Sequence, residues 1–555
     1  MKRYSEAFEA FQTMHSKLKL SSDLLVHGAP FHRCCIDQHI DLNLIVELFH
    51  QYVDATDPIR KVVEQTIRHM PRMLIDTTTG RLYDKTRQAE AFEELPIFHE
   101  LRSSMTTGLD RKRIRKEVKG FYRYVMLSHR WQASEPTFQM VEDTSVYSLP
   151  ASPTNGKLQH FCKLVHSLDF QWAWSDTCCV NQLDKGVQQE SLVAMFRWYR
   201  GSTLTIVHLL GVLSEFQGPG DLWRSIWNTR AWTYQEYIAA KVVQFYTEDW
   251  KPYLSLSIFN HKESATILAE MERATNRATQ ELATLCPGLD RAREKLFLAS
   301  KRQSTREEDI AYSLLGIFNA SIPVIYGEGN RAVGRLLEYV LAGFGDVTLL
   351  AWTGRAGDYN SCLPPDLTVY DQLVPPHIPQ PIEVAEMDGI IMALRSSLPD
   401  PSFAVALHDH LHRLPLPSFS ASRLGLPGIV FPVTQLDTVG SDSDVYRATT
   451  SGLGEVEIKT KDDLSGMMDL LFVHPWISPI LDQEFPRSAA TLDQTTRALR
   501  LVARLRQPFG ALLLEPVSRT RYRRVAADCL IMAQVREETS LTELIDGIRI
   551  TVDIQ

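Results

Sequence analysis

A helical stretch that holds one carboxylate among aromatic residues is the first candidate for chemistry in this sequence. The segment WNTRAWTYQEYIAAKV places Glu236 four positions after Trp232. Residues four apart share one face of a helix, so we expect the indole and the carboxylate to lie side by side. Such an acid either forms a structural ion pair, with Arg230 or Lys241 as neighbouring cations, or acts on a substrate. The spacing alone leaves both interpretations open.

Polar residues also follow two segments that have the composition of buried strands. FYRYVMLS ends in Ser128 and is followed by His129 and Arg130. FQWAWSD ends in Asp176. Runs of aromatic, aliphatic and β-branched residues are typical of strands covered on both faces. Because ligands of open α/β sheets bind outside the carboxyl ends of the strands, we expect these side chains, together with Glu236, to face one crevice.

The elements that must position these residues alternate between strand-like and helical patterns. Two further strand-like runs, STLTIVHLLG and KVVQFYT, follow along the chain, and segments of helical period separate the four runs. One of these segments, VQQESLVAMFRWYRG, is expected to be an amphipathic helix that ends at Gly201. Strands and helices in alternation predict an α/β domain with a parallel sheet flanked by helices.

The rest of the chain divides by pattern into further regions. We expect a helical region over 1–70, the α/β domain over 71–250, a helical extension over 251–365 and a β-rich α+β accessory domain over 366–555. In the first region a helical stripe holds Leu42, Ile45, Val46 and Phe49. In the extension, REEDIAYSLLGIFNAS and GNRAVGRLLEYVLAGFG are expected to form a helical hairpin.

The prediction for residues 366–555 rests on two segments in which apolar and polar residues alternate and on one pattern that caps a helix. GEVEIKT alternates so that Val456 and Ile458 point inward. IRITVDI does the same and is expected to bury Ile548, Ile550, Val552 and Ile554. SLTEL offers a capping box for a last short helix.

Composition narrows the class of protein. The chain has 555 residues, of which 44% are hydrophobic and 23% charged, as in folded globular proteins. A formal net charge of −8 gives no global attraction for a polyanion, which argues against nucleic acid as a partner. The basic run DRKRIRKEVKG keeps helical spacing and is expected to be a solvated helix face. We find no run of about 18 apolar residues, so we expect no membrane span. We expect the protein to lie in the cytoplasm.

Other candidate motifs are weaker. The eight cysteines show no zinc-type spacing, so no metal site is expected. Cys178 and Cys179 follow a strand, but burial among tryptophans would raise rather than lower a thiol pKa. YGEGN, residues 326–330, could cradle an anion before a helix, although a plain turn is the favoured interpretation.

Three segments together resemble a known family. YVMLSHRW, then WAWSDTCCVNQ with ESLVAMFRWYRGSTLTIVHLLGV, then WNTRAWTYQE resemble the three signature blocks of the fungal heterokaryon incompatibility (HET) domain, in the same order. The segment from REEDIAY to GDVTLLAWTG resembles the one that commonly follows this domain. The resemblance covers roughly residues 72–365. It implies a role in fungal nonself recognition, in which incompatible fusion triggers programmed cell death.

The resemblance also implies a fold and a chemistry. HET domains are similar to TIR domains, which are flavodoxin-like modules, and some TIR domains cleave NAD⁺ between nicotinamide and ribose. Their catalytic glutamate lies in a Trp-x-x-x-Glu pattern, which Trp232 and Glu236 match, although Tyr234 replaces the usual aliphatic residue. Glu236 would stabilise the positive charge that develops on the ribose. NAD⁺ would be the substrate, and no cofactor would be required.

The resemblance assigns supporting roles to the other candidates. Arg130 would hold the pyrophosphate, Trp131 or Trp232 would stack on a ring, and Asp176 would bind sugar hydroxyls. The full set expected to bind NAD⁺ is Ser128, Arg130, Trp131, Asp176 and Trp232. Two alternatives stay open: a non-enzymatic signalling or oligomerisation module, and a degenerate homologue that regulates others. The expected partners are further copies of the chain or other incompatibility proteins.

Overall fold

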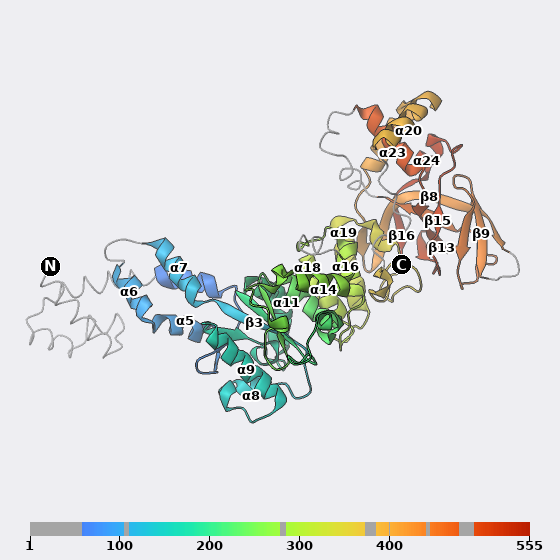
Figure 1. Cartoon of the computed structure of the whole chain (residues 1–555). Coiled ribbons are helices and arrows are strands. Elements are labelled where there is room, and N and C mark those ends of the chain that lie inside the picture. Colours follow the sequence, from blue (N-terminus) through green and yellow to red (C-terminus); the bar gives the residue numbers. More distant parts are fainter. Residues whose placement is uncertain are drawn as a thin grey trace, which may run out of the picture. The chain divides into compact units, whose positions relative to one another are not determined.

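The computed structural model describes most of the chain (Figure 1). The described residues are 58–104, 110–277, 285–371, 384–398, 400–439, 444–476 and 493–555. They belong to two compact units between which the chain passes repeatedly. The first unit holds Met1–Ser191, Arg197–His208 and Ala240–Lys262, and the second holds Leu192–Phe196, Leu209–Ala239 and Glu263–Gln555. The helical stripe expected at 42–49 lies outside the described residues, and the four domain boundaries stay a prediction.

A six-stranded sheet in the order β2-β1-β4-β3-β5-β6 is the centre of the α/β architecture. Its strands are β1 (Leu74–Asp76), β2 (Leu82–Tyr83), β3 (Tyr124–His129), β4 (Trp172–Trp174), β5 (Leu204–Leu209) and β6 (Val243–Thr247). β3 pairs in parallel with both β4 and β5, as predicted. β1 runs antiparallel to β4 and to β2, so the sheet is mixed rather than wholly parallel. A short turn joins β1 to β2, and only antiparallel strands can be joined that way.

The central strands form where the sequence has continuous apolar runs. Every residue of β3, β4 and β5 is buried. Two helices of the domain begin at capping residues whose oxygen atoms accept backbone N–H groups: Ser152 for α9 (Pro153–Ser167) and Asp184 for α11 (Lys185–Gly201). α11 ends at Gly201, as predicted. A Cβ there would lie 2.9 Å from the Tyr124 hydroxyl, so the glycine permits close approach to β3.

The helices α5 (Lys85–Glu93), α6 (Pro96–Ser104) and α7 (Arg111–Phe121) precede β3 in the first unit, after a helical stretch over 58–67. The basic run forms α7, in which Ile114 and Val118 are buried and the arginines and lysines are half-buried or exposed. Asp110 caps α7 by accepting the backbone N–H groups of Lys112 and Arg113. This confirms the interpretation of the run as a solvated helix face.

The second unit contributes short helices around α13 (Ala231–Ala239). They are α12 (Asp221–Arg224), α14 (Ala265–Thr275), α16 (Ala292–Ser300), α17 (Asp309–Tyr312), α18 (Leu315–Phe318) and α19 (Arg331–Phe344). α17 and α18 replace the single helix expected from REEDIAYSLLGIF. The Ser313 hydroxyl between them donates to the Ile310 carbonyl, and such a bond competes with helix continuation.

Five strands of the second unit pair into a closed ring. They are β8 (Arg423–Thr438), β11 (Leu471–Pro475), β13 (Leu512–Ser518), β14 (Arg521–Arg524) and β16 (Ile548–Ile554). The pairing runs β8-β11-β13-β14-β16 and returns to β8. Only β14 and β16 run parallel within the ring. We call these strands the C-terminal barrel, because ring closure leaves no unpaired edge among them.

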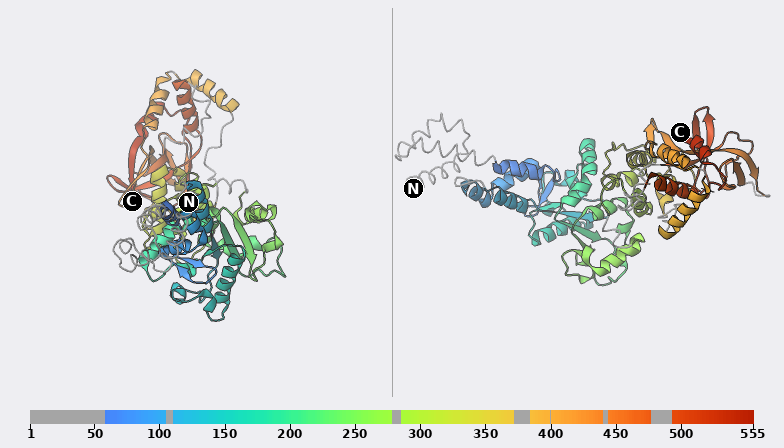
Figure 2. Two further views of the ribbon diagram at one scale, coloured as in Figure 1. Left: turned by 90° about the vertical axis from the view of Figure 1, so that its left-hand side faces the viewer. Right: turned by 90° about the horizontal axis from the view of Figure 1, so that it is seen from above.

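Further strands and helices surround the barrel. The strands are β7 (Ser418–Ser420), β9 (Val445–Thr450), β10 (Val456–Lys459), β12 (Phe509–Gly510) and β15 (Met532–Ala533). The helices are α20 (Val384–Ser397), α21 (Ser402–His412), α23 (Gln494–Leu505) and α24 (Leu541–Gly547). α20, α23 and α24 lie together beside the strands (Figures 1 and 2). The β-rich α+β character expected for the tail is confirmed.

The inward positions of the tail were predicted with one error. Val456, Ile458, Val552 and Ile554 are buried, and Ser540 caps α24 as the capping signal indicated. Ile550 was predicted to point inward, but 68% of it is exposed. The pairing of β16 with β8 shifts register between Arg549 and Val552, and such a bulge reverses the alternation of faces.

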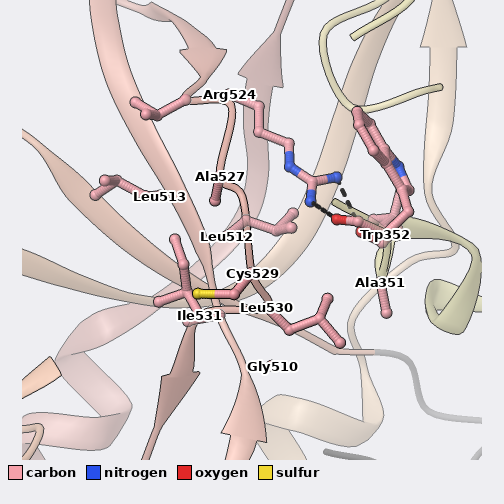
Figure 3. Close-up of a pocket in the computed structure, with 13 residues that line it drawn as sticks. Ala351, Trp352, Gly510, Leu512, Leu513, Arg524, Ala527, Cys529, Leu530 and Ile531 are labelled. Atoms are coloured by element: carbon pink, nitrogen blue, oxygen red, sulfur yellow. Dashed lines mark hydrogen bonds between the residues drawn. The ribbon is translucent and has the colours of Figure 1, made fainter. Parts of the chain in front are cut away.

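A buried arginine ties the segment before the barrel to β14 (Figure 3). Arg524 donates to the carbonyl oxygens of Leu350 at 2.9 Å and Trp352 at 2.7 Å, and its guanidinium lies 4.1 Å from the Trp352 ring centroid. Burial lowers the pKa of Arg524. The pocket beside it has a volume of about 20 Å³, which holds about one water molecule. We therefore interpret it as a structural joint. None of the described helices is long and apolar enough to cross a bilayer.

Candidate functional site

A carboxylate, an imidazole and an indole meet where the central strands of the first unit end. Asp176 begins the turn of helix α10 (Asp176–Cys179) directly after β4. Its Oδ1 lies 3.1 Å from His129 Nε2 at the end of β3. The indole Nε1 of Trp131 donates to its Oδ2 at 2.7 Å. The sequence placed all three residues at strand ends, and the parallel pairing of β3 with β4 brings them together.

His129 in this group is neutral at ordinary pH. Its imidazole is buried, which lowers its pKa; the nearby Lys157 lowers it further, and the hydrogen bond with Asp176 offsets only part of the shift. A neutral imidazole beside a carboxylate donates its Nε2 proton to it. His129 therefore orients Asp176 rather than serving as a proton donor to a substrate.

The loop after β3 is fixed by a buried ion pair. The Lys157 ammonium on α9 contacts the Glu135 carboxylate, and both side chains are almost wholly buried. Glu135 Oε1 also accepts the backbone N–H of Gln132 at 2.8 Å. These contacts hold the chain on both sides of Trp131. Sequence reasoning missed the pair, because Lys157 lies in an ordinary helical run and nothing local marks Glu135 as its partner.

A second buried histidine adjoins the group through the sheet. His208 on β5 is the register partner of His129. Burial lowers the pKa of His208 to about 4, although its hydrogen bond to the Glu248 carbonyl opposes the shift. Its ring centroid lies 4.6 Å from that of Trp250, which also stacks with His160. A second buried imidazole of lowered pKa therefore lies next to His129 in the sheet.

The exposed part of this group can bind a planar, hydroxyl-bearing ligand. Trp131 is 41% exposed, and 20% of the Asp176 side chain is exposed. A fixed indole offers a stacking surface, and a carboxylate accepts hydrogen bonds from hydroxyl groups. We call Trp131, Asp176 and His129 the strand-end site.

The other residues predicted for this edge have different surroundings. Ser128 is 1% exposed within β3, so its hydroxyl does not reach the surface. The Arg130 side chain is exposed, and its carbonyl oxygen lies 3.4 Å from Lys157 Nζ. Arg130 is thus accessible to an anionic ligand, whereas Ser128 is not. Their roles in binding NAD⁺ stay predictions.

Glu236 lies in the interior of the second unit. It is 4% exposed on α13. Burial lowers the pKa of Arg302 to about 10, and electrostatic interactions with the nearby Tyr234 and Glu236 oppose that shift. Arg302 also donates to the Arg230 carbonyl at 2.9 Å and to Thr233 Oγ1 at 3.1 Å. Arg302 is therefore one cation near Glu236, and the expected ion pair with Arg230 or Lys241 stays a prediction.

The side chain of Trp232 contacts the segment after α13 that also holds Arg302. It makes a side-chain hydrogen bond with Asp309, whose Oδ1 also accepts the Tyr326 hydroxyl at 2.9 Å. Burial raises the pKa of Asp309, and these two hydrogen bonds oppose the shift. Both residues of the Trp-x-x-x-Glu pattern are thus engaged by residues 302–326. The expected convergence of Glu236 with Arg130 and Asp176 stays a prediction, since α13 and the strand-end site belong to different units.

Two weaker motifs are accounted for by structure. Cys178 is buried, and its pKa is raised well above the ordinary value by a hydrogen bond with Cys179 and by burial. In YGEGN, the Glu308 carboxylate accepts the backbone N–H groups of Gly327 at 2.6 Å and Gly329 at 3.1 Å. Burial alone would raise the pKa of Glu308, but these bonds lower it. The chain's own carboxylate fills the anion cradle, which confirms the interpretation as a structural turn.

The fold and the site define an α/β protein with a ligand site at the carboxyl ends of parallel strands. The family model of the heterokaryon incompatibility protein (HET) matches residues 124–219. The chain is 32% identical over 237 residues to the vegetative incompatibility protein HET-E-1 of Podospora anserina. That stretch covers 39% of this chain and 16% of the relative. No solved structure matches. Residues 124–219 are therefore similar to the HET domain, as the sequence blocks indicated.

The family match covers one candidate site and not the other. Residues 124–219 include the strand-end site, whereas α13 with Trp232 and Glu236 lies beyond them. The likeness to TIR and flavodoxin-like folds stays a prediction.

Proposed function

We propose that the protein acts in fungal nonself recognition and triggers cell death in heterokaryon incompatibility. The match of residues 124–219 to the HET family carries this proposal. The identity of 32% to a vegetative incompatibility protein supports it. Because the aligned stretch is a small part of that relative, we transfer the role of the HET region alone.

NAD⁺ is the small molecule that we propose for the strand-end site. The exposed indole of Trp131 would stack on a ring of the dinucleotide, and Asp176 would accept hydrogen bonds from ribose hydroxyls. Arg130, exposed beside them, would pair with the pyrophosphate. In the cleavage step, water adds to the anomeric carbon and releases one proton to solvent, while nicotinamide leaves with the electron pair of the broken bond. Nicotinamide departs as a neutral molecule, so no general acid is needed.

Glu236 is the proposed catalytic carboxylate. Because it is buried, it can act only after a change of conformation. At 4% exposure and beside Arg302, it would reach a substrate only after α13 separates from the segment that follows. The same observation favours a second candidate function. In that alternative the HET domain signals by association with other proteins, and Glu236 only stabilises α13.

One pair of assays separates the candidates. We would induce wild type, Glu236→Gln, Asp176→Asn and Glu190→Gln in a fungal host, and measure growth together with nicotinamide release by the purified proteins. Glu190 is an exposed carboxylate on α11 and serves as the matched control. The enzymatic proposal expects Glu236→Gln to lose about a hundredfold or more of nicotinamide release. Toxicity that persists in Glu236→Gln without nicotinamide release would support the signalling function instead.

A further inference from the structure

The C-terminal barrel carries two adjacent irregularities that turn aliphatic side chains outward. β13 shifts register against β14 between Pro516 and Ser518, and Val517 is 49% exposed. The bulge in β16 exposes Ile550, as described above. β14 and β16 run parallel with Arg521 opposite Asp553, so the residues before these two lie at the same end of the barrel. Val517 and Ile550 therefore project from one end of the barrel face that β13, β14 and β16 form.

Arginines surround these two side chains. Arg521 and Arg523 lie on one face of β14, and the turn before them holds Arg519. Arg549 on β16 is also exposed. Arg523 is paired with Glu515. In the part of the chain that the structure describes, no carboxylate lies within ion-pair distance of Arg519, Arg521 or Arg549.

This local charge is opposite to that of the whole chain. The protein has a formal net charge of −8, yet the arginines of this face outnumber its carboxylates, Glu515 and Asp553. Asp553 lies 3.7 Å from a further arginine, Arg423 of β8. The guanidinium of Arg549 donates to the carbonyl oxygens of Asp546 at 2.8 Å and Ile548 at 3.0 Å, and no carboxylate among the described residues neutralises its charge. Guanidinium groups that no carboxylate neutralises attract phosphate, and an excess on one small face favours an extended anionic partner.

We propose that this face of the C-terminal barrel binds the surface of an anionic phospholipid membrane. Arg519, Arg521 and Arg549 would contact lipid phosphates, while Val517 and Ile550 would enter the boundary between headgroups and acyl chains. The association is peripheral and needs no spanning helix. It rests on the barrel alone and is independent of the function proposed for the HET domain.

The exposed apolar groups distinguish a membrane from a nucleic acid. Proteins that bind single strands present aromatic rings on which bases stack. Here the exposed apolar side chains are aliphatic, and the one aromatic residue of β14, Tyr522, is half-buried. Aliphatic side chains beside arginines match the amphipathic boundary of a bilayer better than they match bases.

Vesicle co-sedimentation of the full chain tests the proposal. We would compare phosphatidylcholine vesicles with vesicles that also contain phosphatidylserine. The test variant is Arg519→Glu/Arg521→Glu, and the matched control is Lys459→Glu/Lys461→Glu, which makes the same charge change at exposed sites around β10. Wild type and control should bind the phosphatidylserine vesicles, and the test variant should bind at least about tenfold more weakly. Binding to phosphatidylcholine alone should be weak for all three.

A second variant tests the aliphatic contribution. Val517→Ser/Ile550→Ser should keep binding at low salt but lose it at high salt, because screening removes the charge attraction that remains. Equal loss in the test and control charge variants would overturn the proposal. So would absence of wild-type binding to phosphatidylserine vesicles, or displacement of bound protein from them by single-stranded RNA at concentrations below those of the lipid.

Discussion

Substitution of Arg302 gives the most direct test of whether Glu236 is structural. Arg302→Met keeps the length of the side chain but removes the positive charge next to Glu236 and the hydrogen bonds to Arg230 and Thr233. We expect the second unit to lose about 4 kcal/mol of unfolding free energy, because breaking a buried ion pair on one side typically costs about 3–5 kcal/mol. Glu236→Gln alone should cost less, about 2 kcal/mol, since the amide keeps hydrogen bonding.

The double variant separates charge pairing from general disruption. If Arg302 and Glu236 stabilise each other, Arg302→Met/Glu236→Gln should cost about 3 to 4 kcal/mol rather than the sum of the single costs. The coupling free energy would then be about 2 kcal/mol or more. Urea unfolding, followed by the fluorescence of Trp227 and Trp232, measures all four proteins. Costs that add within about 0.5 kcal/mol would refute the pairing of Arg302 with Glu236.

Three further predictions concern the barrel, a helix contact and the strand-end site. Burial lowers the pKa of His474 from 6.5 to about 3, and its ring stacks on Phe509, so the unfolded chain binds the proton more readily. The unfolding free energy should therefore fall as the pH drops below 6.5, by about 2 kcal/mol at pH about 5. Denaturant unfolding should show a loss that is about 2 kcal/mol larger in wild type than in His474→Phe. A Cβ at Gly316 would lie 2.1 Å from the Phe196 Cβ, so Gly316→Ala should cost about 2 kcal/mol or more, and calorimetry should show partial recovery with Phe196→Ala. Trp131→Ala should lower the unfolding free energy by less than about 1 kcal/mol yet abolish quenching of intrinsic fluorescence by NAD⁺, and unchanged quenching would exclude Trp131 from the binding site.

Local patterns were sufficient to predict the strands and most helices. β3 and β5 are continuous apolar runs, and α11 ends at its glycine, so each element is determined by residues close together in the sequence. The position of Asp176 and His129 at strand ends was also predictable. Their contact follows once β3 and β4 pair in parallel.

Contacts between residues far apart in the sequence were not predicted. Arg302 lies near Glu236, and Glu308 fills the YGEGN cradle, yet neither residue belongs to the motif that it contacts. The exposure of Ile550 depends on a register shift against β8, which alternation within β16 does not reveal. Sequence periodicity describes one element, whereas these features belong to pairs of elements.

The long strand β8 has a consequence for how the protein is made. This strand of 16 residues pairs with β7, β9, β11 and β16, and β16 ends at Ile554. The barrel therefore closes only after β16 has left the ribosome, more than a hundred residues after β8. Contacts of such long sequence separation form slowly, so β8 spends synthesis without its final neighbour and is the segment most in need of chaperone protection.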